Sequence, residues 1–196
     1  MPPEGSNAEP NVAKQVVRIL LQEHRAIEDG LARLEALLAA KCFPFRWTEA
    51  DGSELGELVA VLQKETQDHV RREEEVLFPA LEGFLPRQEG PLCVLRSEHQ
   101  PLAAGLDRLR SSSEALHSGI CPAVKLNELQ SHSRAFIQLM RDHFYKEDRV
   151  LFPLIAPFLT AELDRALQRG LEAIGCSEPA EPAGDPCHDA CQTRHD

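Results

Sequence analysis

Apolar residues recur three and four positions apart along most of the chain, the spacing that places them on one face of an α-helix. The predicted helices span about residues 11–40, 53–79, 91–117, 122–153 and 160–174. We expect the buried stripes of the second and fourth helices to end at Val76 and Val150. Pro79 should kink or end the second helix because it has no N–H for the carbonyl of Glu75. The pattern predicts an all-α fold.

Residues with capping chemistry mark several of the predicted helix ends. Asn11 suits the start of the first helix, and Thr160 suits the start of a short extra C-terminal helix. Thr48 with Asp51, or Asp51 and Ser53 themselves, are the candidates for the second. Residues 1–10 and 176–196, rich in Pro, predict a disordered lead and tail. One domain is therefore expected at 11–175.

A polar motif occurs twice within the hydrophobic pattern. His69-Val70-Arg71-Arg72-Glu73 has a counterpart 74 residues later in His143-Phe144-Tyr145-Lys146-Glu147, and Val-Leu-Phe-Pro follows each copy. Glu23-His24 recurs at an offset of 75 as Glu98-His99. The chain thus contains two helical hairpins, each with a lone His on its first helix and His-x-x-x-Glu on its second. This arrangement favours one four-helix bundle over a repeat array.

The repeated polar residues share the helix faces that carry the apolar residues. They are His24, His69, Glu73, His99, His143 and Glu147. A buried carboxylate costs several kcal/mol unless a proton, a partner or a metal compensates it, and these stripes contain no Lys or Arg. Four imidazoles and two carboxylates suit two transition-metal ions, each bound by two histidines and both bridged by the glutamates. Iron, or manganese, is the expected occupant.

Other residues with ligand chemistry are expected to lie outside this site. Glu74 and Asp148 are turned off the buried stripe, so that replacing them should matter little. His132 precedes His143 by three turns, roughly 16 Å, and is interpreted as a core or bundle-end histidine. The tail residues Cys187, His188, Cys191 and His195 lack a common metal-site spacing, so a disordered tail is preferred over a second metal site.

The ordered set of His24, His69-x-x-x-Glu73, His99 and His143-x-x-x-Glu147, with Leu-Phe-Pro after each pair, resembles the hemerythrin-like (HHE cation-binding) domain over about residues 11–158. The resemblance implies an up-down-up-down bundle around a non-haem di-iron centre bridged by the two glutamates. It makes Glu23 and Glu98 candidates to support the ligands or line a channel. Oxygen-carrying members have a further histidine at the position of Ala103, which we place on the ligand face, so stable oxygen carriage is not expected.

Composition narrows the class of partner and the compartment. The net charge of −11 argues against nucleic acid and anionic membrane surfaces as partners. The chain has neither a secretory leader pattern nor an apolar run long enough to cross a membrane, so we expect a cytoplasmic protein. Its six scattered cysteines would be mostly reduced there.

These observations lead to one main functional hypothesis. We expect a di-iron protein that binds or reacts with small oxidants such as oxygen, peroxide or nitric oxide; whether it is an enzyme stays open. The alternative is a non-catalytic iron- or oxygen-responsive sensor or interaction protein. Iron-donating repair of iron–sulfur clusters has less support, because the sequence lacks the N-terminal cysteine-bearing domain of many repair relatives.

Overall fold

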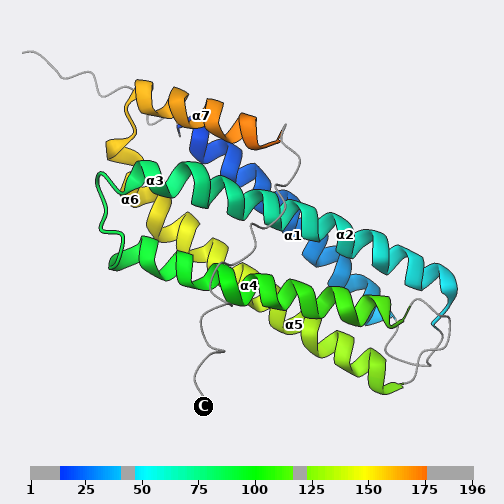
Figure 1. The fold of residues 1–196 in the computed structure, drawn as a ribbon. Helices are drawn as coiled ribbons and strands as arrows, with labels where there is room; N and C mark the ends of the chain where they lie inside the picture. The colour runs from blue at the N-terminus through cyan, green and yellow to red at the C-terminus, as the bar shows by residue number, and fades with distance from the viewer. Residues whose placement is uncertain (1–13, 41–46, 117–122, 176–196) are drawn as a thin grey trace, which may run out of the picture.

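Four long antiparallel helices form the body of the protein (Figure 1). The computed structural model describes residues 14–40, 47–116 and 123–175. The four helices are α1 (Gln15–Ala40), α2 (Glu49–Arg72), α4 (Gly90–Glu114) and α5 (Ala123–Lys146). Helix α1 packs against α2 and α5, and α4 packs against the same two helices. The bundle therefore has the up-down-up-down arrangement expected from the sequence.

Each helix that carries a His-x-x-x-Glu pair continues through a π-helical turn. These turns are η1 (Glu73–Leu77), followed by α3 (Phe78–Leu81), and η2 (Glu147–Leu151), followed by α6 (Phe152–Ile155). The amide of Phe78 donates to the carbonyl of Glu73, five residues earlier, and the amide of Phe152 does the same to Glu147. Single π turns of this kind are frequent at functional sites. Here each one begins at a glutamate of the repeated motif.

The π turns correct the predicted buried stripes. A π turn contains an extra residue, which shifts the inward-facing positions that follow it by one. Leu77 and Leu151 are fully buried, whereas Val76 is only partly buried and Val150 is 49% exposed. The prediction for Val76 and Val150 was therefore wrong. Pro79 lies in the first turn of α3, where a missing N–H is tolerated.

The helix starts agree with the sequence in two cases. Thr48 and Asp51 form a reciprocal capping box at α2. Thr160 accepts a hydrogen bond from the Leu163 amide at the start of α7 (Ala161–Gly175), which follows a 3-10 turn, η3 (Ala156–Phe158). Both caps were among those predicted.

Helix α1 begins differently from the prediction, at Gln15 rather than soon after residue 11. Its first two amides, those of Gln15 and Val16, donate to the carboxylate of Asp164 on α7, over 3.2 and 3.0 Å. A residue distant in the sequence therefore caps this helix, whereas the proposed cap, Asn11, lies outside the described residues. The lead, the tail and its candidate ligands also lie outside them.

Two apolar clusters fill the bundle, one on each side of the histidines. The α7 cluster includes Val16, Leu20, Leu77, Phe78, Leu92, Leu95, Leu151, Phe152, Leu167 and Leu171. The distal cluster includes Ile27, Leu31, Leu55, Leu62, Leu102, Leu106, Leu129, Phe136, Met140 and Phe144. Helix α7 lies against α1 and α2 and covers the end of the bundle that holds the α7 cluster (Figure 1).

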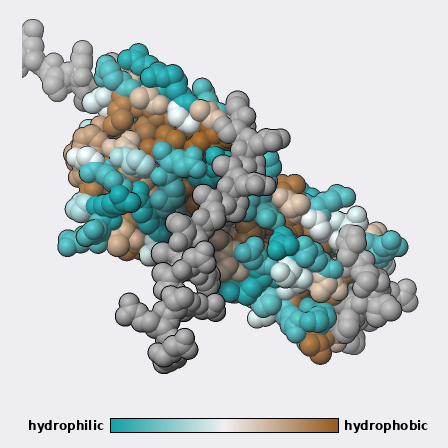
Figure 2. Space-filling model, in the orientation of Figure 1, coloured by the Kyte–Doolittle hydropathy of each residue, from teal (hydrophilic) through white to brown (hydrophobic). Residues whose placement is uncertain are grey.

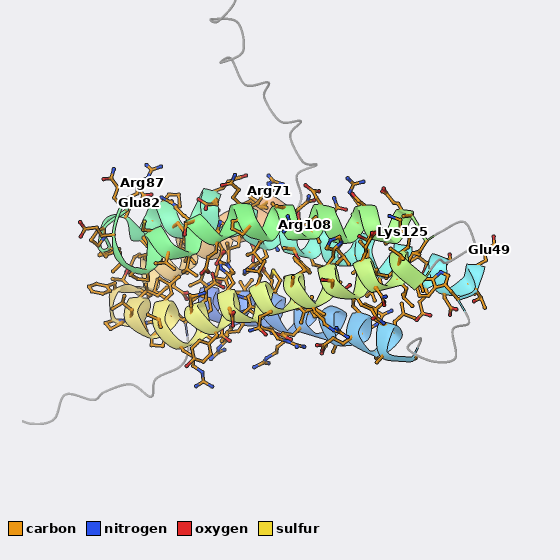
Figure 3. All side chains as sticks on the ribbon, turned by 90° about the horizontal axis from the view of Figure 1, so that it is seen from below. Glu49, Arg71, Glu82, Arg87, Arg108 and Lys125 are labelled. Carbon is orange, nitrogen blue, oxygen red and sulfur yellow. The ribbon has the colours of Figure 1, made fainter. Side chains whose placement is uncertain are left out.

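Polar and charged side chains occupy the outside of the bundle. Hydrophilic atoms cover much of the face in Figure 2, and apolar atoms gather beside α7 where it meets the bundle. Charged residues such as Arg87 and Glu49 project outward in Figure 3. Among the described residues, no helix is both long and apolar enough to cross a membrane.

Candidate metal centre

Four fully buried residues from two helices converge between the apolar clusters. They are His69, Glu73, His143 and Glu147, and each offers a ligand atom within 4.8 Å of the others. Their positions follow from the four-residue spacing, which places both members of each pair on the inner face of α2 or α5. The two remaining predicted ligands are His24 on α1 and His99 on α4, whose side chains are 4% and 9% exposed and contact Glu147 and Glu73.

Glu147 reaches histidines from three helices. Its Oε2 lies 3.0 Å from Nε2 of His24 and 3.7 Å from Nε2 of His69. Its Oε1 lies 3.3 Å from Nε2 of His143. The two oxygens of one carboxylate are thus directed at different imidazoles.

Glu73 occupies the related position in the first repeat. Its Oε2 lies 3.1 Å from Nε2 of His99, 3.7 Å from that of His143 and 3.8 Å from that of His69. The rings themselves form two pairs: the centroids of His24 and His69 are 4.8 Å apart, and those of His99 and His143 are 5.1 Å apart. Each glutamate therefore contacts both histidine pairs, as ligands that bridge two ions must.

Every one of the four histidines has a carboxylate at its other ring nitrogen, Nδ1. The pairs are His69 with Glu23 at 3.0 Å, His143 with Glu98 at 3.0 Å, His24 with Asp148 at 2.9 Å, and His99 with Glu74 at 2.6 Å. A carboxylate accepts a hydrogen bond, so Nδ1 carries the proton and the Nε2 lone pair points into the site. Such partners orient metal-binding histidines and make them more basic.

Two of these carboxylates were misjudged from the sequence. Glu74 and Asp148 lie off the buried stripe, as predicted, but each reaches across to the lone histidine of a neighbouring helix. These contacts remove the reason for expecting that their replacement would matter little. The sequence did contain a signal, because an acid follows Glu73 and Glu147 directly in both repeats. Glu23 and Glu98, the candidates to support the ligands or line a channel, contact Nδ1 of His69 and of His143.

Cations hold three of the four carboxylates in place. Lys146 contacts Glu98 at 2.6 Å, and Arg96 contacts Glu74 at 3.1 Å. Burial raises the pKa of Glu98, but the hydrogen bonds from Lys146 and His143 lower it further, so that its pKa lies below the ordinary value. Lys146 and Arg96 thus fix the positions of the two carboxylates that orient His143 and His99.

The third carboxylate links the site to α7. Arg72 contacts Glu23 at 3.0 Å, and its Nε donates to the backbone carbonyl of Leu171 over 3.2 Å. A chain of contacts therefore runs from α7 through Arg72 and Glu23 to His69. Because both Arg72 and Glu23 are more than four-fifths buried, solvent weakens this contact less than it would an exposed ion pair.

The inner atoms of the site lack partners, and this tests whether a metal fits. Within the described residues, the unsatisfied buried atoms of the site are Nε2 of His24, His69 and His143, Oε1 of Glu73, and both oxygens of Glu147. Imidazole lone pairs that face carboxylate oxygens repel one another unless a proton or a cation lies between them. Nitrogen and carboxylate donors together suit iron and manganese, so the residues present fit such ions.

Without metal, protons are the remaining counter-charge. Burial lowers the pKa of His69, but the carboxylates of Glu73, Glu147 and Glu23 raise it more, so that its pKa lies well above the ordinary value. Burial likewise lowers the pKa values of His24 and His143, but the neighbouring carboxylates raise them more, so that both lie above the ordinary value. The cluster therefore attracts positive charge strongly.

Aromatic rings cover the imidazoles. His24 lies between Phe144 and Phe152, with ring centroids 4.1 and 5.7 Å away and interplanar angles of 17° and 19°. Phe78 stacks on His99 at 5.7 Å. The apolar cover keeps water away and strengthens electrostatic interactions inside the site.

One further residue, Ala103, is not where the sequence interpretation put it, whereas His132 agrees with its interpretation as a bundle-end histidine. Ala103 is exposed, whereas Leu102 is buried, so position 103 does not face the site and its small side chain leaves no gap there. His132 is only partly buried and contacts the Ser112 hydroxyl at 2.7 Å, away from the other histidines. Pro101 lies inside α4, which continues through it.

Comparison with known proteins gives a consistent result. The model of the hemerythrin HHE cation-binding domain matches residues 15–155 and, in an overlapping match, 92–173. Similar curated proteins include proteins named iron-sulfur cluster repair protein YtfE from Yersinia pestis (strain Pestoides F) and Yersinia pseudotuberculosis serotype O:1b (strain IP 31758). Each is 30% identical over 100 residues, which is 50% of this chain and 44% of the relative. The match therefore spans less than half of the length of those proteins.

Proposed function

The chain belongs to the hemerythrin HHE cation-binding domain family, and on that premise we propose that it holds two iron ions and binds or reacts with small oxidants. The ligands would be His24 and His69 at one ion and His99 and His143 at the other, with Glu73 and Glu147 bridging. Manganese is the alternative metal. When bound, an iron pair would supply reversible electron transfer to oxygen, peroxide or nitric oxide.

One observation carries this proposal: six buried nitrogen and oxygen atoms without partners, which belong to His24, His69, Glu73, His143 and Glu147 on three of the four bundle helices. A core that retains two carboxylates and four imidazoles at this cost needs compensating positive charge. The number of donors exceeds what a single tetrahedral zinc ion uses. The two histidine pairs, each in contact with both glutamates, support two ions rather than one.

The protein groups around the centre have separate tasks. The four outer carboxylates hold Nδ1–H and thereby direct every Nε2 inward. The phenylalanine rings on His24 and His99 limit access to small molecules and exclude bulk water. Small oxidants are therefore the class of ligand that we propose.

Metal analysis of anaerobically purified protein tests the proposal. We expect two iron ions per chain at saturation, and absorption changes on adding oxygen, peroxide or nitric oxide. A Glu73→Gln variant serves as a control that keeps the side-chain volume but loses the bridging charge. A saturated content of one metal per chain, or preference for zinc during iron-replete growth, would contradict the proposal.

The same measurements separate an enzyme from a carrier or sensor. Continuous consumption of peroxide or nitric oxide with a defined product would favour catalysis. A reversible spectral change without a product would favour binding alone. Because Ala103 is exposed and does not face the site, the residue at this position does not argue against oxygen carriage, and this measurement decides that question too.

A sensor is the second candidate, and the contact from Arg72 to the Leu171 carbonyl favours it. Through Glu23 and His69, the occupancy of the metal site is connected to the packing of α7. In that case, hydrogen exchange of the α7 amides should slow markedly when iron is added. Equal exchange with and without metal would argue against sensing through α7.

Repair of iron–sulfur clusters is a third proposal, suggested by the names of the relatives. The alignment covers 44% of those proteins, so their activity does not transfer with the match. Iron-loaded protein mixed with a cluster-depleted iron–sulfur enzyme would restore that enzyme if the proposal holds. If free iron at the same concentration restored the iron–sulfur enzyme equally well, the repair proposal would be contradicted.

A further inference from the structure

Thr66 carries a buried hydroxyl that the metal ligands do not explain. Its side chain is 3% exposed, and its Oγ1 has no hydrogen-bond partner within the described residues. A threonine inside a helix usually donates to the carbonyl four residues earlier or to a neighbour. The other buried hydroxyls of the described residues have such partners: Ser113 donates to the carbonyl of Arg110, three residues earlier, and Ser133 donates to that of Leu129, four residues earlier. An unpaired buried hydroxyl is costly and points to a partner outside the chain.

Thr66 belongs to a layer of four residues that lies one turn from the four histidines. The others are Ile27, three residues after His24, Leu102, three after His99, and Met140, three before His143. Because α1 and α4 run opposite to α2 and α5, all four residues lie on the same side of the histidines. Ile27, Leu102 and Met140 are members of the distal cluster, so Thr66 is the one hydroxyl in this layer.

The layer lies on the side of the histidines opposite to Glu73 and Glu147. Glu73 and Glu147 follow their histidines and begin η1 and η2, on the side of the α7 cluster. At 100° per residue, Thr66 and Glu73 are about 20° apart around α2, so both point to the bundle centre. Helical side chains also lean toward the N-terminus, which brings the His69 ring toward the turn that contains Thr66.

We propose that the Thr66 hydroxyl donates a hydrogen bond to a small anion bound at the metal pair on the side of the distal cluster. This inference rests on the proposed two-iron centre and adds a specificity-determining residue to it. A hydroxyl among apolar side chains favours ligands that accept a hydrogen bond, such as azide or peroxide. Met140, the counterpart of Thr66 in the second repeat, cannot donate, so the two halves of the duplicated chain differ here.

Azide binding to the iron-loaded, oxidised protein tests this role. We expect Thr66→Val, which keeps the shape but removes the hydroxyl, to weaken azide binding about tenfold, as the loss of a hydrogen bond to an anion implies. Thr66→Ser should restore the affinity to within about twofold. Ser133→Ala removes a buried hydroxyl that already has its partner and should leave azide binding unchanged.

A second measurement separates ligand recognition from a structural role. In the metal-free protein, Thr66→Val should raise the melting temperature by about 2–4 °C, because an unpaired hydroxyl is replaced by a methyl group. Iron content should stay at two per chain. Unchanged azide affinity in Thr66→Val, failure of Thr66→Ser to restore it, or loss of iron would each overturn the inference. If the unaltered protein failed to hold two iron ions, the proposed function would fall and this inference with it.

Discussion

Replacing Glu23 by Ala tests whether the carboxylates behind the histidines control metal affinity. Glu23 contacts Nδ1 of His69 at 3.0 Å and the guanidinium of Arg72 at 3.0 Å, and it is 17% exposed. Its removal leaves His69 without the group that fixes its proton on Nδ1. Loss of such a partner typically costs 10- to 100-fold in metal affinity, about 1.4–2.7 kcal/mol. We expect Glu23→Ala to weaken iron binding by this amount.

The repeat supplies a graded comparison for this variant. Glu98 holds His143 in the same way, but Glu98 and its cation Lys146 are 25% and 37% exposed, whereas Arg72 is only 19% exposed. Water can replace part of the Glu98 interaction, so Glu98→Ala should cost less affinity than Glu23→Ala. Glu23→Gln keeps a hydrogen-bond acceptor for Nδ1 and should lie between Glu23→Ala and the unaltered protein.

Anaerobic competition with a coloured iron(II) chelator measures these affinities, and circular dichroism checks that each variant is folded. Glu28→Ala is the matched control on α1, because it removes an exposed ion pair with Arg141 that touches no candidate ligand. That change should alter stability by less than about 1 kcal/mol and leave iron affinity unchanged. Iron affinity of Glu23→Ala within twofold of the unaltered protein would refute the reasoning.

Four other outcomes are expected. Glu73→Gln should lose the iron pair but stay helical, as metal analysis with circular dichroism would show; retention of both ions would contradict bridging. Metal-free protein should be most stable below about pH 6.5 and should lose stability as the pH rises through the raised histidine pKa values, which melting curves between about pH 5 and 9 would show. Iron-loaded protein should instead release iron as the pH falls, because protons compete for Nε2, and the chelator assay measures this release. A Cβ on Gly170 would lie 2.7 Å from Val76, so Gly170→Ala should destabilise the protein by about 1–3 kcal/mol, measured by urea unfolding. Deleting residues 178–196 should leave iron content unchanged, since all six candidate ligands lie elsewhere; a fall would revive a tail site.

The sequence predicted the helices and the six candidate ligands because both depend on spacing along one helix. His69 and Glu73 share a face whatever the neighbouring helix does, and so do His143 and Glu147. The caps at Thr48 and Thr160 are equally local, which explains why both were found. The two lone histidines, His24 and His99, were added to the candidate ligands because they occur at matching positions in the two repeats.

The sequence alone did not predict the π turns. A helical wheel assumes a constant 100° per residue, and one extra residue in η1 and η2 moves the buried positions from Val76 and Val150 to Leu77 and Leu151. The repeated Leu-Phe-Pro after each glutamate was visible, but Pro indicates only that regular hydrogen bonding must change. It does not say whether the helix ends, kinks or widens.

Contacts between helices were decided by tertiary structure. Glu74 and Asp148 are off the stripe of their own helices, yet the packing of α2 against α4 and of α5 against α1 brings them to His99 and His24. Asp164 caps α1 from 149 residues away in the chain for the same reason. Local spacing fixes which face a residue occupies, but only the rotation and offset of neighbouring helices fix what that residue touches, because these depend on how the side chains of both helices interlock.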